Sequence, residues 1–80
     1  MVTVKFFAQL RETAGSESVE VAATDLEQLY TVLEQLLGSD ISVQLRAENV
    51  RVAVNQSIVS VNTTLRAGDE VAFLPPVTGG

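Results

Sequence analysis

The chain of 80 residues contains no cysteine and no histidine. Without cysteine it can form no disulfide, and it offers no thiolate as a nucleophile or iron–sulfur ligand. Without histidine it lacks the usual general base and the commonest metal ligand in proteins. We therefore expect a chain that is not catalytic alone and that binds no metal or cofactor of its own.

Basic residues are also scarce. The chain has five Lys and Arg and ten Asp and Glu, which gives a net charge of −5. Nucleic acid and anionic membrane surfaces both require a basic footprint, so we expect neither as a partner. The acidic balance is compatible with a basic protein partner or simply with solubility. No signal pattern opens the chain, and no apolar run approaches the roughly 20 residues of a membrane span. The sequence thus predicts a cytoplasmic protein.

The first half of the chain predicts two strands and a helix. The stretch 2–7 alternates apolar and polar residues, while Phe7 adds a ring on the opposite face, either under a neighbouring segment or on a partner surface. A connection over 8–16 then leads to a short edge strand over 17–21, which predicts an antiparallel hairpin with a wide loop. The helix is expected from about Asp25 to Leu37, with Thr24 and Glu27 as a capping box and Gly38 as a left-handed cap. Its apolar stripe is interpreted as core: Leu26, Leu29, Tyr30, Leu33, Leu36 and Leu37.

The second half predicts a crossover followed by three short strands. Residues 39–49 fit either a short strand or one turn of helix, and both interpretations stay open here. Strands are expected over 50–54, 58–61 and 71–74, with a tight turn at 55–57. Leu65 is expected in the core and Gly68 in a polar turn. Leu74 shares the face opposite to Val71, so it points away from the core, as Phe7 does.

This order of elements predicts an α+β fold, because the leucine stripe of one main helix must be covered by a sheet. The β-grasp, or ubiquitin-like, roll fits, with a mixed sheet of about five strands and the helix packed across it. The N- and C-terminal strands would pair in parallel at the centre. We expect a domain over 1–74 and an extended tail over 75–80.

The tail has the sequence PPVTGG. Pro75 and Pro76 favour extended backbone, as do the β-branched Val77 and Thr78. Gly79 and Gly80 lack Cβ atoms and can enter a channel that is too narrow for a side chain. Such a tail suits presentation of its terminal carboxylate to another protein's active site, although a frayed terminus is the common alternative.

Taken together, these segments resemble the small, sulfur-carrying subunit of molybdopterin synthase over the whole length of the chain. The segments that carry the resemblance are Val4 to Gln9 with Arg11 and Glu12, Ala53 to Gln56, Gly68 to Phe73, and the PPVTGG tail. The tail joined to the Gly-Asp-Glu-Val strand is the specific part. The resemblance implies that Gly80 becomes a C-terminal thiocarboxylate after an E1-like enzyme adenylates it with ATP and a sulfur donor supplies sulfur.

The same resemblance implies the partners and their binding sites. The tail would enter the large synthase subunit and donate sulfur to cyclic pyranopterin monophosphate, in a heterotetramer that builds the molybdopterin dithiolene. Phe7, Ile58 and Leu74 correspond to the family's docking patch, and Arg11 to a position that can reach the partner. Other members of this fold suggest alternatives: a carrier for thiamine or tRNA thiolation, a ubiquitin-like modifier conjugated to lysines, or a plain interaction domain.

Overall fold

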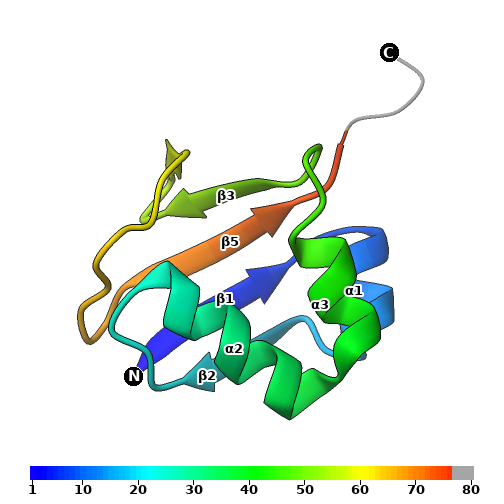
Figure 1. Ribbon diagram of the computed structural model, residues 1–80, viewed down its shortest axis with the longest axis horizontal. Helices are drawn as coiled ribbons and strands as arrows, with labels where there is room; N and C mark the ends of the chain where they lie inside the picture. Colours follow the sequence, from blue (N-terminus) through cyan, green and yellow to red (C-terminus); the bar gives the residue numbers. More distant parts are fainter. Residues whose placement is uncertain (77–80) are drawn as a thin grey trace.

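A mixed five-stranded sheet with strand order β2-β1-β5-β3-β4 is the centre of the fold in the computed structural model, which describes residues 1–76 (Figure 1). The predicted β-grasp architecture is confirmed. The elements in chain order are β1 (Val2–Phe6), α1 (Gln9–Ala14), β2 (Ser18–Val21), α2 (Leu26–Leu37), α3 (Ser39–Leu45), β3 (Arg51–Val54), β4 (Ser57–Val59) and β5 (Glu70–Leu74).

Strands β1 and β5 lie side by side and run in parallel at the middle of the sheet, as predicted. Figure 1 shows both arrowheads at the same end of the sheet. The β1–β2, β3–β4 and β3–β5 pairs are antiparallel. Residues on one face of the two central strands are fully buried, because alternate side chains of a strand point to the same face. These are Val2, Val4, Phe6, Val71 and Phe73.

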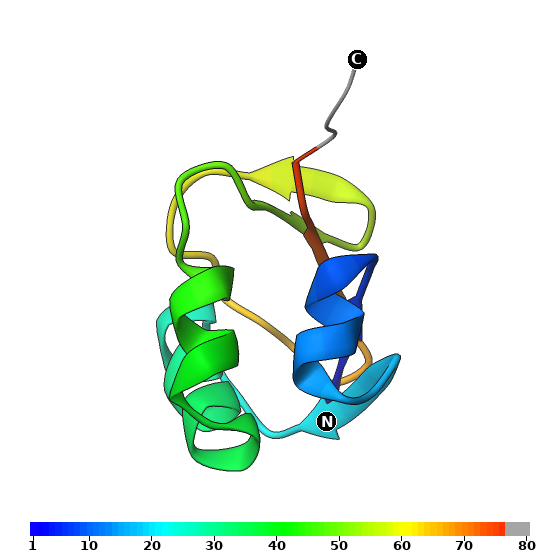
Figure 2. The ribbon, with the colours of Figure 1, turned by 90° about the vertical axis from the view of Figure 1, so that its right-hand side faces the viewer.

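Helices α2 and α3 cover this buried face (Figure 2). Three leucines of α2 are in the core, and the aromatic rings continue the packing: Phe6 stacks on Phe73 with ring centroids 6.1 Å apart, and Tyr30 lies 5.7 Å from Phe73. Burying such rings supplies much of the stability of a small domain. The stripe is narrower than predicted, because Leu36 is 56% exposed.

The predicted connection over 8–16 is wrong in part, since six of its residues form α1. Leu10 anchors this helix in the core, and Gly15 ends it in the left-handed conformation with φ 74°, where its N–H donates to the Arg11 carbonyl at 3.0 Å. A helix of one and a half turns with a single core side chain is too short to show a 3.6-residue period. The sequence pattern therefore could not reveal it.

Helix α2 is capped one residue later than predicted. Asp25 is the N-cap, and its Oδ1 accepts from the Gln28 N–H at 2.8 Å. The Gln28 side chain in turn accepts from the N–H and the hydroxyl of Thr24. The cap is therefore shifted from the predicted Thr24 and Glu27 to Asp25 and Gln28, and the bond back from the Gln28 side chain goes to Thr24, the residue before the N-cap. Gly38 follows with φ 101° and ψ 172°, which is not the predicted left-handed cap.

Residues 39–45 form α3, so the strand interpretation of this region is wrong and the helical one is confirmed. A strand would place Ile41, Val43 and Leu45 on one face. Instead, Ile41 and Leu45 are buried while Val43 is 72% exposed, which is the pattern of helical spacing.

The remaining strands lie close to their predicted bounds. β4 ends at Val59, two residues before its predicted end at Val61. Asn55 and Gln56 form the hairpin turn between β3 and β4, both with positive φ, as a two-residue hairpin requires. Leu65 is buried and Gly68 has φ 90°, as expected.

Candidate functional site

Residues of the sheet that point away from the helices form an outer face, and this face surrounds the start of the tail. The register places Arg51 opposite Leu74, and the next outward row crosses the sheet through Lys5, Ala72, Ala53 and Ile58. Because Phe6 pairs with Phe73, one further step along both strands brings Phe7 level with Leu74. The outer face thus gathers Phe7, Leu74 and Ile58 around the end of β5.

The predicted docking residues are accessible to different degrees. Phe7 is 44% exposed and Ile58 is 56% exposed, whereas Leu74 is half-buried. Outward positions for Phe7 and Leu74 were expected from strand alternation, and the structure confirms them. That these side chains bind a partner stays a prediction.

A strained turn positions Phe7. Ala8 has φ 53° and ψ −130°, and the Leu10 N–H donates to the Phe7 carbonyl at 3.1 Å across it. This backbone conformation is one that glycine adopts easily and that a Cβ atom disfavours. The turn sends the chain from β1 directly into α1 and leaves the Phe7 ring at the surface.

A small cleft of about 160 Å³ lies beside Phe7 and is lined by Lys5, Phe6, Phe7, Arg11, Glu17 and Ser18. Arg11 is exposed on α1 and lines this cleft together with Phe7. That it reaches a partner stays a prediction. Lys5 forms an ion pair with Glu70 at 3.2 Å. Both side chains are partly exposed to solvent, so this pair contributes little stability.

The tail itself is described only in part. Pro75 and Pro76 follow β5 directly and are half-buried. The predicted site residues Val77, Thr78, Gly79 and Gly80 lie outside the described residues, and the division between domain and tail at residue 74 stays a prediction.

Arg51 is a candidate that the sequence analysis missed. It alternates with Val50 and Val52, and this pattern alone could have placed it on the outer face with Ala53. Its importance follows only from the pairing of β3 with β5, which sets it beside Leu74.

The opposite end of β5 is closed by hydrogen bonds between two turns. The Asn55 amide donates to Asp69 Oδ1 at 3.0 Å, and its oxygen accepts from the Glu70 N–H at 3.0 Å. The Arg66 N–H donates to Asp69 Oδ2 at 2.8 Å. This last bond, followed by the bond from Asn55, holds the pKa of Asp69 below its ordinary value of 3.8.

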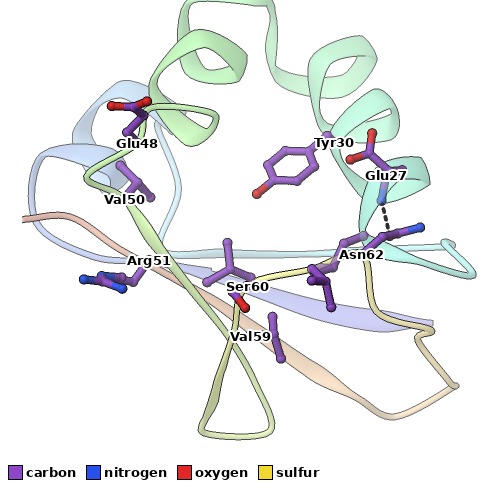
Figure 3. A pocket seen from close by; sticks show the side chains of 11 residues that line it. Glu27, Tyr30, Glu48, Val50, Arg51, Val59, Ser60 and Asn62 are labelled. Atoms are coloured by element: carbon purple, nitrogen blue, oxygen red, sulfur yellow. Dashed lines mark hydrogen bonds between the residues drawn. The ribbon is translucent and has the colours of Figure 1, made fainter.

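A larger cleft of about 350 Å³ lies between α2 and the β3–β4 edge of the sheet (Figure 3). The Tyr30 ring points into it from α2, and the Arg46 guanidinium lies 4.6 Å from the ring centroid. Burial raises the pKa of the Tyr30 hydroxyl above its ordinary value of 10.0, although Arg46 opposes this. Asn62 supports the rim by accepting from the Glu27 N–H at 3.0 Å.

Two kinds of feature are absent from residues 1–76. No helix in this part of the chain is long and apolar enough to cross a membrane. The same residues contain no group of three or more His, Cys, Asp or Glu side chains that is placed to hold a metal ion.

The chain is similar to known proteins over its whole length. The family described as the ThiS family matches residues 4–80. The molybdopterin synthase sulfur carrier subunit of Escherichia coli K12 is 43% identical, with all of both chains covered. The small archaeal modifier protein 1 of Haloferax volcanii is 31% identical, with 95% of this chain and 97% of that protein covered.

Two solved structures are similar over nearly their full length. One is from the Amycolatopsis orientalis BexX/CysO complex, with a TM-score of 0.87, 27% identity and complete coverage of both chains. The other is from the complex of subunits 1 and 2 of the molybdopterin-converting factor of Helicobacter pylori, with a TM-score of 0.72, 29% identity and coverage of 99% and 97%.

Proposed function

Because the chain belongs to the ThiS family, we propose that it is a sulfur carrier that holds sulfur as a thiocarboxylate on Gly80 and donates it within molybdopterin synthase. The observation that carries this proposal is the full-length similarity to molybdopterin synthase sulfur carrier subunits, which includes the C-terminal end of the chain. The outer face at the end of β5 supports it, since exposed apolar side chains there are suited to a protein partner.

The first chemical step is activation of the terminal carboxylate. A carboxylate is a poor acyl donor, so a Gly80 oxygen attacks the α-phosphorus of ATP in an E1-like enzyme and pyrophosphate leaves. A sulfur nucleophile from the donor protein then attacks the acyl carbon, and AMP leaves. That nucleophile is the terminal sulfur of a persulfide on the donor, so the product is an acyl disulfide. A thiol reductant then cleaves the S–S bond, the donor leaves as a thiol, and the C-terminus keeps the sulfur as a thiocarboxylate. Glycine at the end leaves this carbonyl open to attack, because it has no side chain.

The second step takes place in the large subunit. This chain has no histidine or cysteine, so the large subunit supplies the acid–base groups and binds the phosphate of cyclic pyranopterin monophosphate. A dithiolene contains two sulfur atoms, so two loaded carriers are consumed for each molybdopterin. In an extended tail, the six residues after Leu74 span at most about 20 Å, enough to cross a narrow channel.

Docking of the domain holds the tail in that channel. Phe7, Leu74 and Ile58 contribute the apolar contacts, and Arg11 borders them. The proposal for a large-subunit partner is supported by the Helicobacter pylori structure, which is a complex of the two subunits of the molybdopterin-converting factor.

Intact mass spectrometry tests the carrier chemistry. The purified chain is incubated with the E1-like enzyme, ATP and a sulfur source, and a gain of about 16 Da marks replacement of oxygen by sulfur. Omission of ATP and deletion of Gly80 are the two controls, and both should abolish the gain. No gain for the intact chain under complete conditions would refute the proposal.

Protein modification is a second candidate function, favoured by the similarity to the small archaeal modifier protein 1. A modifier would join Gly80 to lysines of other proteins through an isopeptide bond. Tagged chain recovered from its host would then carry lysine-linked adducts that survive denaturation and reduction. A thiocarboxylate on the free chain without such adducts would favour the carrier function.

A further inference from the structure

Arg51 lies in the middle of the proposed docking face. The β3–β5 register sets it opposite Leu74, and Ala53, two residues along the same face of β3, is opposite Ile58. Arg51 is therefore the direct neighbour of Leu74 and the diagonal neighbour of Ile58, within reach of a long side chain. Its own side chain is exposed.

The charge of Arg51 is not neutralised within residues 1–76, where Lys5 and Glu70 form the single ion pair within 4 Å. Glu48 lines the larger cleft together with Arg51. However, Figure 3 shows the Arg51 side chain pointing away from that cleft and from Tyr30. The guanidinium thus stands as an unpaired cation between two apolar docking residues.

We propose that Arg51 is a docking residue that pairs with a carboxylate on the facing surface of the large subunit. A partner that covers both Leu74 and Ile58 must also cover the residue between them. A guanidinium carries a positive charge and five N–H donors, and these cannot be buried without acceptors. A carboxylate matches this fork with two parallel hydrogen bonds. This inference rests on the proposed function, since it names the chemistry of the same partner's surface.

Arg51 is assigned to docking and not to the phosphate of the pterin substrate. It is level with Leu74, the last residue of β5, whereas the reacting carbonyl is six residues farther on. A tail that extends into the partner carries that carbonyl up to about 20 Å away from Leu74. The distance places Arg51 at the rim of the channel.

Binding of the full chain to the large subunit from the same organism tests the inference. Arg51→Gln should raise the Kd about tenfold or more, because it leaves the partner's carboxylate buried without its cation. Arg51→Glu should weaken binding further, and Arg51→Lys should recover most of the loss because it restores the charge. Arg66→Gln is the matched control, since it removes the same charge from the exposed turn before β5 and should change the Kd less than about twofold.

The outcomes separate this inference from the proposed function. Thermal melts of the variants verify that each is folded. Equal binding by the wild type and Arg51→Gln would overturn the role of Arg51, as would equal weakening by Arg51→Gln and Arg66→Gln, which would indicate a response to net charge alone. Failure of the wild type to bind would overturn the proposed function, and the role of Arg51 with it.

Discussion

The two ends of the sheet, where β5 begins and where it ends, differ in whether their surface side chains have partners among residues 1–76. Where β5 begins, the side chains of Asn55 and Asp69 bind each other and the backbone of neighbouring turns. Where β5 stops, Phe7 and Arg51 are exposed around Leu74. The first end is complete within the chain, whereas the second leaves apolar and cationic groups without partners among residues 1–76.

This difference separates residues that hold the fold from residues that are available to a partner. Changes at the closed end should lower stability and leave binding intact. Changes at the open end should lower binding and leave stability intact, because an exposed side chain contributes little to folding. Each of the following changes tests one side of this distinction.

The largest effect is expected from Phe7→Ser at the open end. Truncation of an aromatic anchor typically costs about 2 kcal/mol or more, so the Kd for the large subunit should rise roughly thirtyfold. Calorimetric titration measures it, and the thermal melt should change little. Leu36→Ser, a similarly exposed apolar residue on α2, is the control and should bind normally. Equal weakening by both would contradict a specific docking face.

Asn55→Ala at the closed end should lower the free energy of unfolding by about 2 kcal/mol, because it removes two hydrogen bonds and places a Cβ-only residue at positive φ. Urea denaturation measures the loss. Glycine adopts the positive φ of this turn without strain, so Asn55→Gly should lower the free energy of unfolding only about half as much as Asn55→Ala does. Asn49→Ala, at an exposed position, is the control. All three variants should bind the large subunit as tightly as the wild type does. A binding defect in folded Asn55→Ala would break the separation of the two ends.

Ala8→Gly, at the turn that positions Phe7, should stabilise the protein by about 1 kcal/mol, since glycine relieves the strain at φ 53°. In a domain of this size the Tm should rise by roughly 4–8 °C. Ala47→Gly is the matched control outside the positive-φ residues and should be neutral or destabilising. A lower Tm for Ala8→Gly would show that the turn is not strained.

The smallest expected effect is the pH dependence of the stability that the Asp69 carboxylate contributes. The pKa of Asp69 is lower in the folded chain than its ordinary 3.8, so its carboxylate stabilises the fold above that pH, and this contribution is lost as the pH falls through the folded pKa. The difference in unfolding free energy between the wild type and Asp69→Asn should therefore be at its full size near pH 7 and should shrink as the pH falls below 3.8. A difference that is constant with pH would exclude this carboxylate as its source.

Much of the fold could be predicted from local pattern. The alternation in β1 and β5 and the turn at Asn55 each act over a few residues, and both were confirmed. The leucine stripe of α2 was confirmed except at Leu36, which is exposed. Helix α1 was missed because one buried leucine carries no period. The cap of α2 was misplaced by one residue because Thr24 and Asp25 are both good caps, and the contact of Asp25 with Gln28 decides between them.

The candidate site likewise has features that follow from the local sequence and features that depend on strand pairing. The sequence by itself determined the Gly-Gly end, the absence of cysteine and histidine, and the outward direction of Phe7 and Leu74, because composition and strand alternation are local properties. Only the tertiary structure decided that Arg51 lies between Leu74 and Ile58. Pairing of β3 with β5 joins residues 23 positions apart at Arg51 and Leu74, and no local pattern encodes that register.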